Sequence, residues 1–116
     1  MNSDVQARST GNGFARISPA DARALIDSRA HNVVDIRDPG AFTAGRIRGA
    51  RLLNNDTLPA FIDEADVEQP CLVCCYHGHS SQQVAAFLAA QGFAEVYSID
   101  GGFEQWRRDY PQHCER

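Results

Sequence analysis

The sequence contains no lysine, and all eleven of its basic side chains are arginine. Without a lysine amine, the chain cannot form a Schiff base with a carbonyl substrate. The lysine that completes a nucleotide-binding phosphate loop is missing for the same reason. Two large classes of enzyme chemistry are therefore excluded.

Long apolar runs are also absent, so no segment is suited to cross a membrane. The first thirteen residues mix Asn, Ser, Asp, Gln, Arg and Gly and lack the apolar stretch of a secretory signal. A net charge of −4 and no basic stripe argue against a nucleic-acid partner. We therefore expect a cytoplasmic protein that binds neither membranes nor nucleic acid.

The four cysteines do not form the spaced set of a disulfide framework, because Cys71, Cys74 and Cys75 lie within five residues and only Cys114 lies apart. In a reducing compartment they are thiols, metal ligands or a nucleophile. Cys71 and Cys74 have the C-x-x-C spacing of redox and zinc sites. Residues three apart on a strand point to opposite faces, however, so we interpret both as core cysteines.

Hydrophobic residues make up 43% of the chain, enough for one core, and β-type and helix-type patterns alternate along it. Such alternation predicts an α/β fold, a parallel sheet with helices on both faces. We divide the chain into a flexible N-terminal tail (1–13), a single domain (14–111) and a C-terminal tail (112–116). The expected strands are 14–17, 33–36, 50–53, 71–75 and 95–99.

Helix starts carry their own signals. Ser18 and Asp38 each precede a proline and are expected to cap a helix, and Asp56 is expected to cap a third that runs to about residue 63. A fourth helix is expected to begin at Ser80 and Ser81 and to end at Gly92. Its apolar stripe comprises Val84, Phe87 and Leu88. The last helix follows Gly101 and Gly102 and has Phe103, Trp106 and Tyr110 on one side.

Cys75 stands at the carboxyl end of the most apolar strand, Cys71-Leu72-Val73-Cys74-Cys75, which is where parallel sheets bind ligands. A short loop with a central glycine joins it to the next helix. Such a loop can turn its amide hydrogens inward as an anion-binding nest, and the helix dipole adds to the effect. Both favour a thiolate over a thiol, which predicts that Cys75 is a nucleophile for an anionic substrate. The alternative is a small buried hydrophobic cysteine.

The segment Cys75-Tyr76-His77-Gly78-His79-Ser80-Ser81 resembles the active-site loop of single-domain rhodaneses, most nearly the bacterial thiosulfate sulfurtransferases of the GlpE type. Further stretches, which together extend over about 14–111, resemble the same family. They are residues 34–39, residues 55–58 and the run from Val96 to Trp106, in which Asp100-Gly101-Gly102-Phe103 is specific and Asp35-x-Arg37 is weaker.

The resemblance implies a rhodanese-like α/β/α sandwich with a five-stranded parallel sheet. It also implies that Cys75 takes the outer sulfur of thiosulfate as a persulfide, releases sulfite, and passes the sulfur to cyanide or to a dithiol protein such as thioredoxin. The substrate-binding loop would comprise Tyr76, His77, Gly78, His79, Ser80 and Ser81. No metal and no organic cofactor are implied.

Arg46 is a departure from the family pattern, because many members have histidine at this position. One interpretation is a tolerated structural change. The other is that Arg46, Arg48 or Arg51 lies near the pocket and attracts a dianion. Two functions likewise remain open for Ser80 and Ser81, as hydroxyl donors to the thiolate or as helix caps only.

Other kinds of protein fit less well. A phosphatase or arsenate reductase of this size uses Cys-x5-Arg, and position 81 holds serine where the phosphate-clamping arginine would stand. A zinc site at Cys75, His77 and His79 lacks a fourth ligand, apart from the distant His113 and Cys114. Asp35 and Arg37 are either catalytic or an ion pair that ties a strand end to a neighbouring loop. A module that only binds a partner, or a persulfide carrier with a dedicated acceptor, is a further alternative.

Overall fold

The computed structural model describes residues 8–9 and 13–116, and most of the expected N-terminal tail lies outside the described residues. Strands and helices alternate along the chain as the sequence predicted. The strands are β1 (Arg8–Ser9), β2 (Ala15–Ile17), β3 (Asn32–Asp35), β4 (Arg46–Ile47), β5 (Arg51–Leu52), β6 (Cys71–Cys74), β7 (Val96–Ile99) and β8 (Cys114–Glu115). The helices are α1 (Pro19–Ser28), α2 (Pro39–Ala44), α3 (Leu58–Glu64), α4 (Ser80–Ala90), α5 (Gly102–Asp109) and the 3₁₀ turn η1 (Pro111–His113).

The main sheet has the strand order β1-β2-β7-β6-β3-β5. Its last five strands are parallel to one another, and only β1 pairs antiparallel, at the edge beside β2. The five-stranded parallel sheet expected from the sequence is therefore confirmed. Since β6 lies between β3 and β7, the residue that follows β6 emerges at the middle of the sheet.

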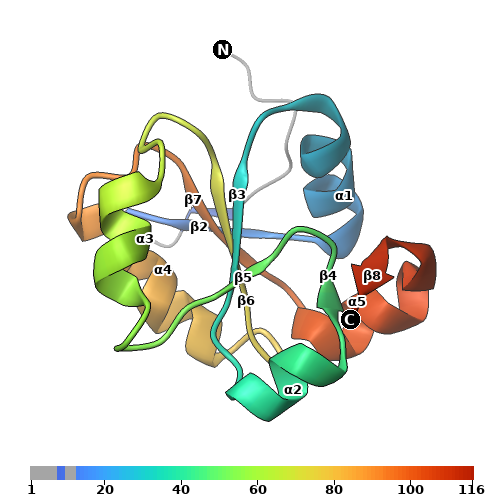
Figure 1. Cartoon of the computed structure of the whole chain (residues 1–116). Coiled ribbons are helices and arrows are strands. Elements are labelled where there is room, and N and C mark those ends of the chain that lie inside the picture. The colour runs from blue at the N-terminus through green and yellow to red at the C-terminus, as the bar shows by residue number, and fades with distance from the viewer. Residues whose placement is uncertain (1–7, 10–12) are drawn as a thin grey trace.

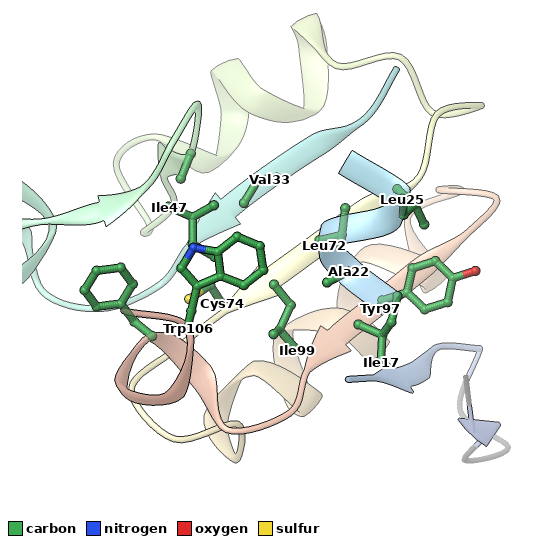
Figure 2. Close-up of a cluster of buried hydrophobic side chains, with 12 residues drawn as sticks. Ile17, Ala22, Leu25, Val33, Ile47, Leu72, Cys74, Tyr97, Ile99 and Trp106 are labelled. Carbon is green, nitrogen blue, oxygen red and sulfur yellow. The ribbon is translucent and has the colours of Figure 1, made fainter. Parts of the chain in front are cut away.

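Helices cover both faces of the sheet, with α1 and α5 on one side and α3 and α4 on the other (Figure 1). Side chains of β6 alternate between the two layers, because successive strand residues point to opposite faces. Leu72 and Cys74 belong to the cluster that includes Trp106, whereas Cys71 and Val73 belong to the cluster that includes Phe61. Figure 2 shows the first of these clusters, in which Trp106 lies against the α1 and α5 side of the sheet.

Two of the predicted helix caps are present. Ser18 Oγ accepts a hydrogen bond from the Asp21 amide at 3.1 Å, and Asp38 Oδ1 accepts one from the Ala41 amide at 3.0 Å. In both helices a proline occupies the first turn, where its missing N–H has no cost. A cap of this kind contributes about 1 kcal/mol to helix stability.

The start of α3 differs from the prediction. Thr57, not Asp56, is the residue before the helix, and its side chain makes no capping bond. Instead, the Asn54 side chain accepts hydrogen bonds from the amides of Asp56 and Thr57 at 2.9 and 3.0 Å. An Asn that bonds its own downstream backbone forms a turn, and this turn takes the place of the expected aspartate cap.

The buried face of α4 also differs from the prediction. Ser81, Ala85 and Leu88 are buried, whereas Phe87 is 44% exposed. The helix ends as expected, because Gly92 has a φ of +107° and the Phe93 amide donates to the Leu88 carbonyl at 3.3 Å. The buried face of α4 is thus turned so that Ser81 faces the sheet, where its hydroxyl contacts Cys75, and Phe87 faces outward.

The last residues were expected as a C-terminal tail (112–116), but they include β8. This strand pairs antiparallel with β4, with Ile47 opposite Cys114 and Arg46 opposite Glu115. The Arg46 and Glu115 side chains also form an ion pair at 3.5 Å. The end of the chain is thereby attached to the segment that follows α2.

Candidate functional site

Cys75 is the first residue beyond the carboxyl end of β6, the central strand of the sheet. All four residues of β6 are buried, as its unbroken apolar run predicted. Cys75 itself is 1% exposed. The strand therefore delivers the thiol to a protected position at the edge of the sheet where ligands bind in parallel α/β folds.

Three hydrogen-bond contacts converge on the Cys75 sulfur. The Gly78 amide donates to Sγ at 3.1 Å, the Ser81 amide donates at 3.3 Å, and the Ser81 Oγ lies 3.1 Å from the same atom. The two amide donors stabilise a negative charge on sulfur. In the third contact the Cys75 thiol donates to Ser81 Oγ, whereas a thiolate can only accept from that hydroxyl. Ser81 is the second residue of α4, so the positive end of that helix dipole points at the same atom.

The loop backbone is held from outside by the first turn of α5. The Phe103 amide donates to the Cys75 carbonyl at 2.8 Å, and the Glu104 amide donates to the Tyr76 carbonyl at 3.2 Å. The close approach requires a glycine at the turn, because a Cβ on Gly102 would lie 2.5 Å from the Cys75 carbonyl oxygen. The segment Asp100–Phe103 thus helps to hold the carbonyls of the Cys75 loop away from the sulfur, while loop amides turn towards it.

The remaining loop residues form the outer surface. Tyr76, His77, His79 and Ser80 are exposed, whereas Gly78 and Ser81 are buried. Gly78 has a φ of +91°, and a Cβ there would lie 2.8 Å from the Gly101 nitrogen. His79 precedes α4 without a side-chain capping bond, so neither serine caps the helix in the expected way. Ser80 is the first helical residue, and the Ser81 hydroxyl contacts Cys75.

Tyr76 links the loop to α2. Its hydroxyl donates a hydrogen bond to Asp38 Oδ2, the carboxylate that also caps that helix. This hydrogen bond holds the pKa of Asp38 below its ordinary value and raises the pKa of the Tyr76 phenol. The pairing of Tyr76 with Asp38 could not be predicted from the sequence, because the two residues are 38 positions apart.

Asp35 and Arg37 form a buried ion pair with 2.7 Å between Nη2 and Oδ2. Arg37 Nη2 also donates to the Gly45 carbonyl at 2.6 Å, and its guanidinium lies 4.2 Å from the centre of the Phe103 ring. The pair ties the end of β3 to the segment after α2, in agreement with the structural interpretation of these residues.

Arg46, Arg48 and Arg51 make contacts away from Cys75. Arg46 pairs with Glu115, Arg51 Nη2 lies 3.0 Å from Glu64, and Arg48 Nη2 donates to the Gln112 carbonyl. These contacts support a structural function for the three arginines, and Arg46 in particular belongs to the β4–β8 pairing.

The other three cysteines lie in surroundings different from those of Cys75. Cys71 and Cys74 are buried on opposite faces of the sheet, which confirms their expected place in the core. Burial raises the pKa of Cys71 to about 12 and raises that of Cys74 well above its ordinary range. Burial also raises the pKa of the partly exposed Cys114. All three are therefore neutral thiols near pH 7, and all four cysteines are free.

Among residues 8–9 and 13–116, no group of three or more histidine, cysteine or carboxylate side chains is placed to hold a metal ion. In the same part of the chain, no helix is long and apolar enough to span a membrane. Ser98 is a site residue that the sequence reasoning did not identify. Its Oγ lies 2.7 Å from the Ser81 Oγ, and the only signal for it is a small polar residue within the apolar strand β7.

A sequence profile of the rhodanese-like domain family matches residues 18–109. The chain is 55% identical over 102 residues to the thiosulfate sulfurtransferase GlpE of Stutzerimonas stutzeri (strain A1501), covering 88% of this chain and 93% of that protein. It is 58% identical over 98 residues to the protein of the same name from Pseudomonas entomophila (strain L48), covering 84% and 89%.

Solved structures resemble the fold. A rhodanese-like domain protein from Staphylococcus aureus superposes with a TM-score of 0.67 at 25% identity, covering 78% of this chain and 89% of that chain. The reduced CoADR-RHD protein of Bacillus anthracis superposes with a TM-score of 0.75 at 21% identity, covering 91% of this chain and 18% of that larger chain.

Proposed function

Since the chain belongs to the rhodanese-like domain family, we propose that it is a thiosulfate sulfurtransferase whose nucleophile is the Cys75 thiolate. The observation that carries this proposal is the convergence of two backbone amides and one hydroxyl on the Cys75 sulfur. The substrate-binding loop comprises Tyr76, His77, Gly78, His79, Ser80 and Ser81.

In the first half of the reaction, the Cys75 thiolate attacks the outer sulfur of thiosulfate. A bond forms between the two sulfurs, and the bond from the outer sulfur to the sulfonate sulfur breaks. The electron pair of the broken bond leaves with sulfite. The product is a Cys75 persulfide anion, and the total charge is the same before and after the step.

In the second half, an acceptor attacks the outer persulfide sulfur and Cys75 leaves as a thiolate. Cyanide yields thiocyanate by this step. A dithiol protein such as thioredoxin yields its own persulfide, which its second thiol resolves to a disulfide as hydrosulfide departs. The donors that stabilise the thiolate before attack stabilise it again as the leaving group.

The loop favours a sulfur substrate over a phosphoryl group. A phosphate clamp needs a planar arginine fork at the end of the cradle, and this position is occupied by Ser81, whose hydroxyl contacts the nucleophile instead. Gly78 and Ser81 close the loop directly on Sγ at 3.1 and 3.3 Å. The resulting site binds a charged sulfur atom.

We place this chemistry in the reducing setting of the cytoplasm, where a thiolate nucleophile and thiol acceptors persist. The four free cysteines agree with such a setting. The transfer needs no cofactor for its balance, because the sulfur atom and its electrons come from thiosulfate.

The experiment that tests this function measures thiocyanate formed from thiosulfate and cyanide. Wild type should turn over, Cys75→Ser should fall to background, and the matched control Cys74→Ala should retain most activity because its side chain lies in the core. Loss of activity in Cys74→Ala alone would show that the nucleophile is misassigned. Hydrolysis of an aryl phosphate by wild type but not by Cys75→Ser would instead support a phosphatase.

A further inference from the structure

Ser98 occupies an unusual position. It lies on β7, opposite Val73 of β6, and it is completely buried. Its neighbours along the strand, Val96, Tyr97 and Ile99, all belong to the hydrophobic clusters. A hydroxyl in such surroundings costs free energy unless it is hydrogen-bonded, so its partner identifies its function.

The partner of Ser98 is Ser81, at 2.7 Å between the two Oγ atoms. Ser81 Oγ in turn lies 3.1 Å from the Cys75 sulfur. Both serines are 0% exposed and Cys75 is 1% exposed, so the three atoms form a linear network closed to bulk water. Within the described residues, Ser81 is the one side-chain partner of the Ser98 hydroxyl.

The number of hydrogens in this network depends on the charge of Cys75. Two contacts join the three atoms, and each contact takes one hydrogen. With a Cys75 thiol the network holds three hydrogens, one on sulfur and one on each serine. Since there are only two contacts, one of these hydrogens has no acceptor among the three atoms. With a thiolate it holds two, which fills both contacts. Ser98 then donates to Ser81, and Ser81 donates to sulfur.

We propose that Ser98 is a positioning residue for sulfur transfer, which orients the Ser81 hydroxyl towards Cys75 and thereby favours the thiolate. Each hydrogen bond in such a chain polarises the next, and a charged acceptor strengthens the whole chain. The same two hydrogens serve when Cys75 is released from its persulfide as a thiolate. This inference rests on the proposed function for its meaning in catalysis, but the network itself can be tested without sulfur transfer.

Other charged and titratable groups surround Cys75 from the elements packed on it. They are Cys74 on β6, Asp35 at the end of β3, Arg37 just after it, Tyr76, His77 and His79 on the loop, Asp100 in the turn before α5, and Glu104 in the first turn of α5. A substitution of Ser98 leaves all of these in place, so a change in the titration of Cys75 reports on the hydroxyl.

The test is a pH titration of thiolate ultraviolet absorbance, with each protein measured against its own Cys75→Ser counterpart. Relative to wild type, Ser98→Ala should move the Cys75 titration to higher pH by about half to one unit, since a second-layer hydrogen bond is lost. Ser98→Thr keeps the hydroxyl and should titrate as wild type does. Val96→Ala removes volume from the same face of β7 and should not move the titration.

The inference would be overturned if the Ser98→Ala and wild-type titration curves coincided. It would also be overturned if Val96→Ala or Ser98→Thr shifted the titration as much as Ser98→Ala does. Sulfur transfer by the same proteins separates this inference from the proposed function. Wild type that takes no sulfur from thiosulfate contradicts the proposed function alone. Wild type and Ser98→Ala that transfer sulfur with identical pH profiles contradict the function of Ser98 alone.

Discussion

Adjacent cysteines in this chain have different surroundings because their side chains point in different directions. Cys74 lies in the apolar layer with Trp106, and burial keeps its thiol neutral. Cys75 is as deeply buried, but amides and a hydroxyl face its sulfur. Burial alone therefore does not set the surroundings of a cysteine, because equally buried sulfurs can face either apolar side chains or hydrogen-bond donors.

A second feature of a single residue is the lack of a side chain at Gly102, which leads to a testable prediction. Gly102→Ala should lower the melting temperature by at least twice as much as Gly49→Ala and should also abolish sulfur transfer. Both glycines have positive φ, but a Cβ at Gly102 meets the Cys75 and Tyr76 backbone at 2.5 Å, whereas a Cβ at Gly49 meets nothing within 4 Å. Backbone strain alone costs about 1 kcal/mol, or roughly 4 °C in a chain of this size.

Thermal unfolding and thiocyanate formation check this prediction, with Gly49→Ala as the matched control. Equal melting temperatures and full activity in both variants would show that the α5 turn does not shape the Cys75 loop.

At the scale of elements, the sequence predicted where helices and strands occur better than it predicted which of their sides are buried. The apolar run of β6 and the proline-bearing starts of α1 and α2 are local signals, and the structure confirms them. On α4 the burial of Leu88 is confirmed, but Phe87 is exposed and the buried face also includes Ser81, whose hydroxyl contacts a sulfur of another element. The pairing of β8 with β4 was missed for a similar reason, since two-residue strands carry no periodic pattern.

The candidate site shows the same division. Cys75 and its loop follow from a strand end, a glycine and a helix start, all adjacent in the sequence. Ser98 and Asp38 reach the site across 17 and 38 positions from their partners, so only the folded sheet reveals them. A small polar residue in the apolar run Val96–Ile99 was the sole signal available for Ser98.

At the scale of the whole molecule, the buried thiols make stability depend on pH. Folding raises the pKa of Cys71 from 9.0 to about 12 and raises that of Cys74 well above its ordinary value. The folded state therefore keeps two protons that the unfolded state releases above about pH 9. This stabilisation is complete below the unfolded pKa and is lost as pH rises towards the folded pKa.

We expect the free energy of unfolding to fall between about pH 9 and pH 12, by roughly 1.4 kcal/mol per pH unit for each thiol. Urea unfolding under reducing conditions, at neutral and at alkaline pH, measures the slope. Cys71→Ala should show a shallower decline than wild type, because one of the two thiols is gone. A wild-type stability that stays flat over this range would contradict the burial of neutral thiols.

The most direct test of the central claim is the mass of the intact protein after treatment with thiosulfate alone. We expect wild type to gain one sulfur atom, which peptide mapping should place on Cys75 and cyanide should remove. Cys75→Ser should keep its original mass under the same treatment. An unchanged wild-type mass, or a sulfur found on Cys71, Cys74 or Cys114, would contradict the account.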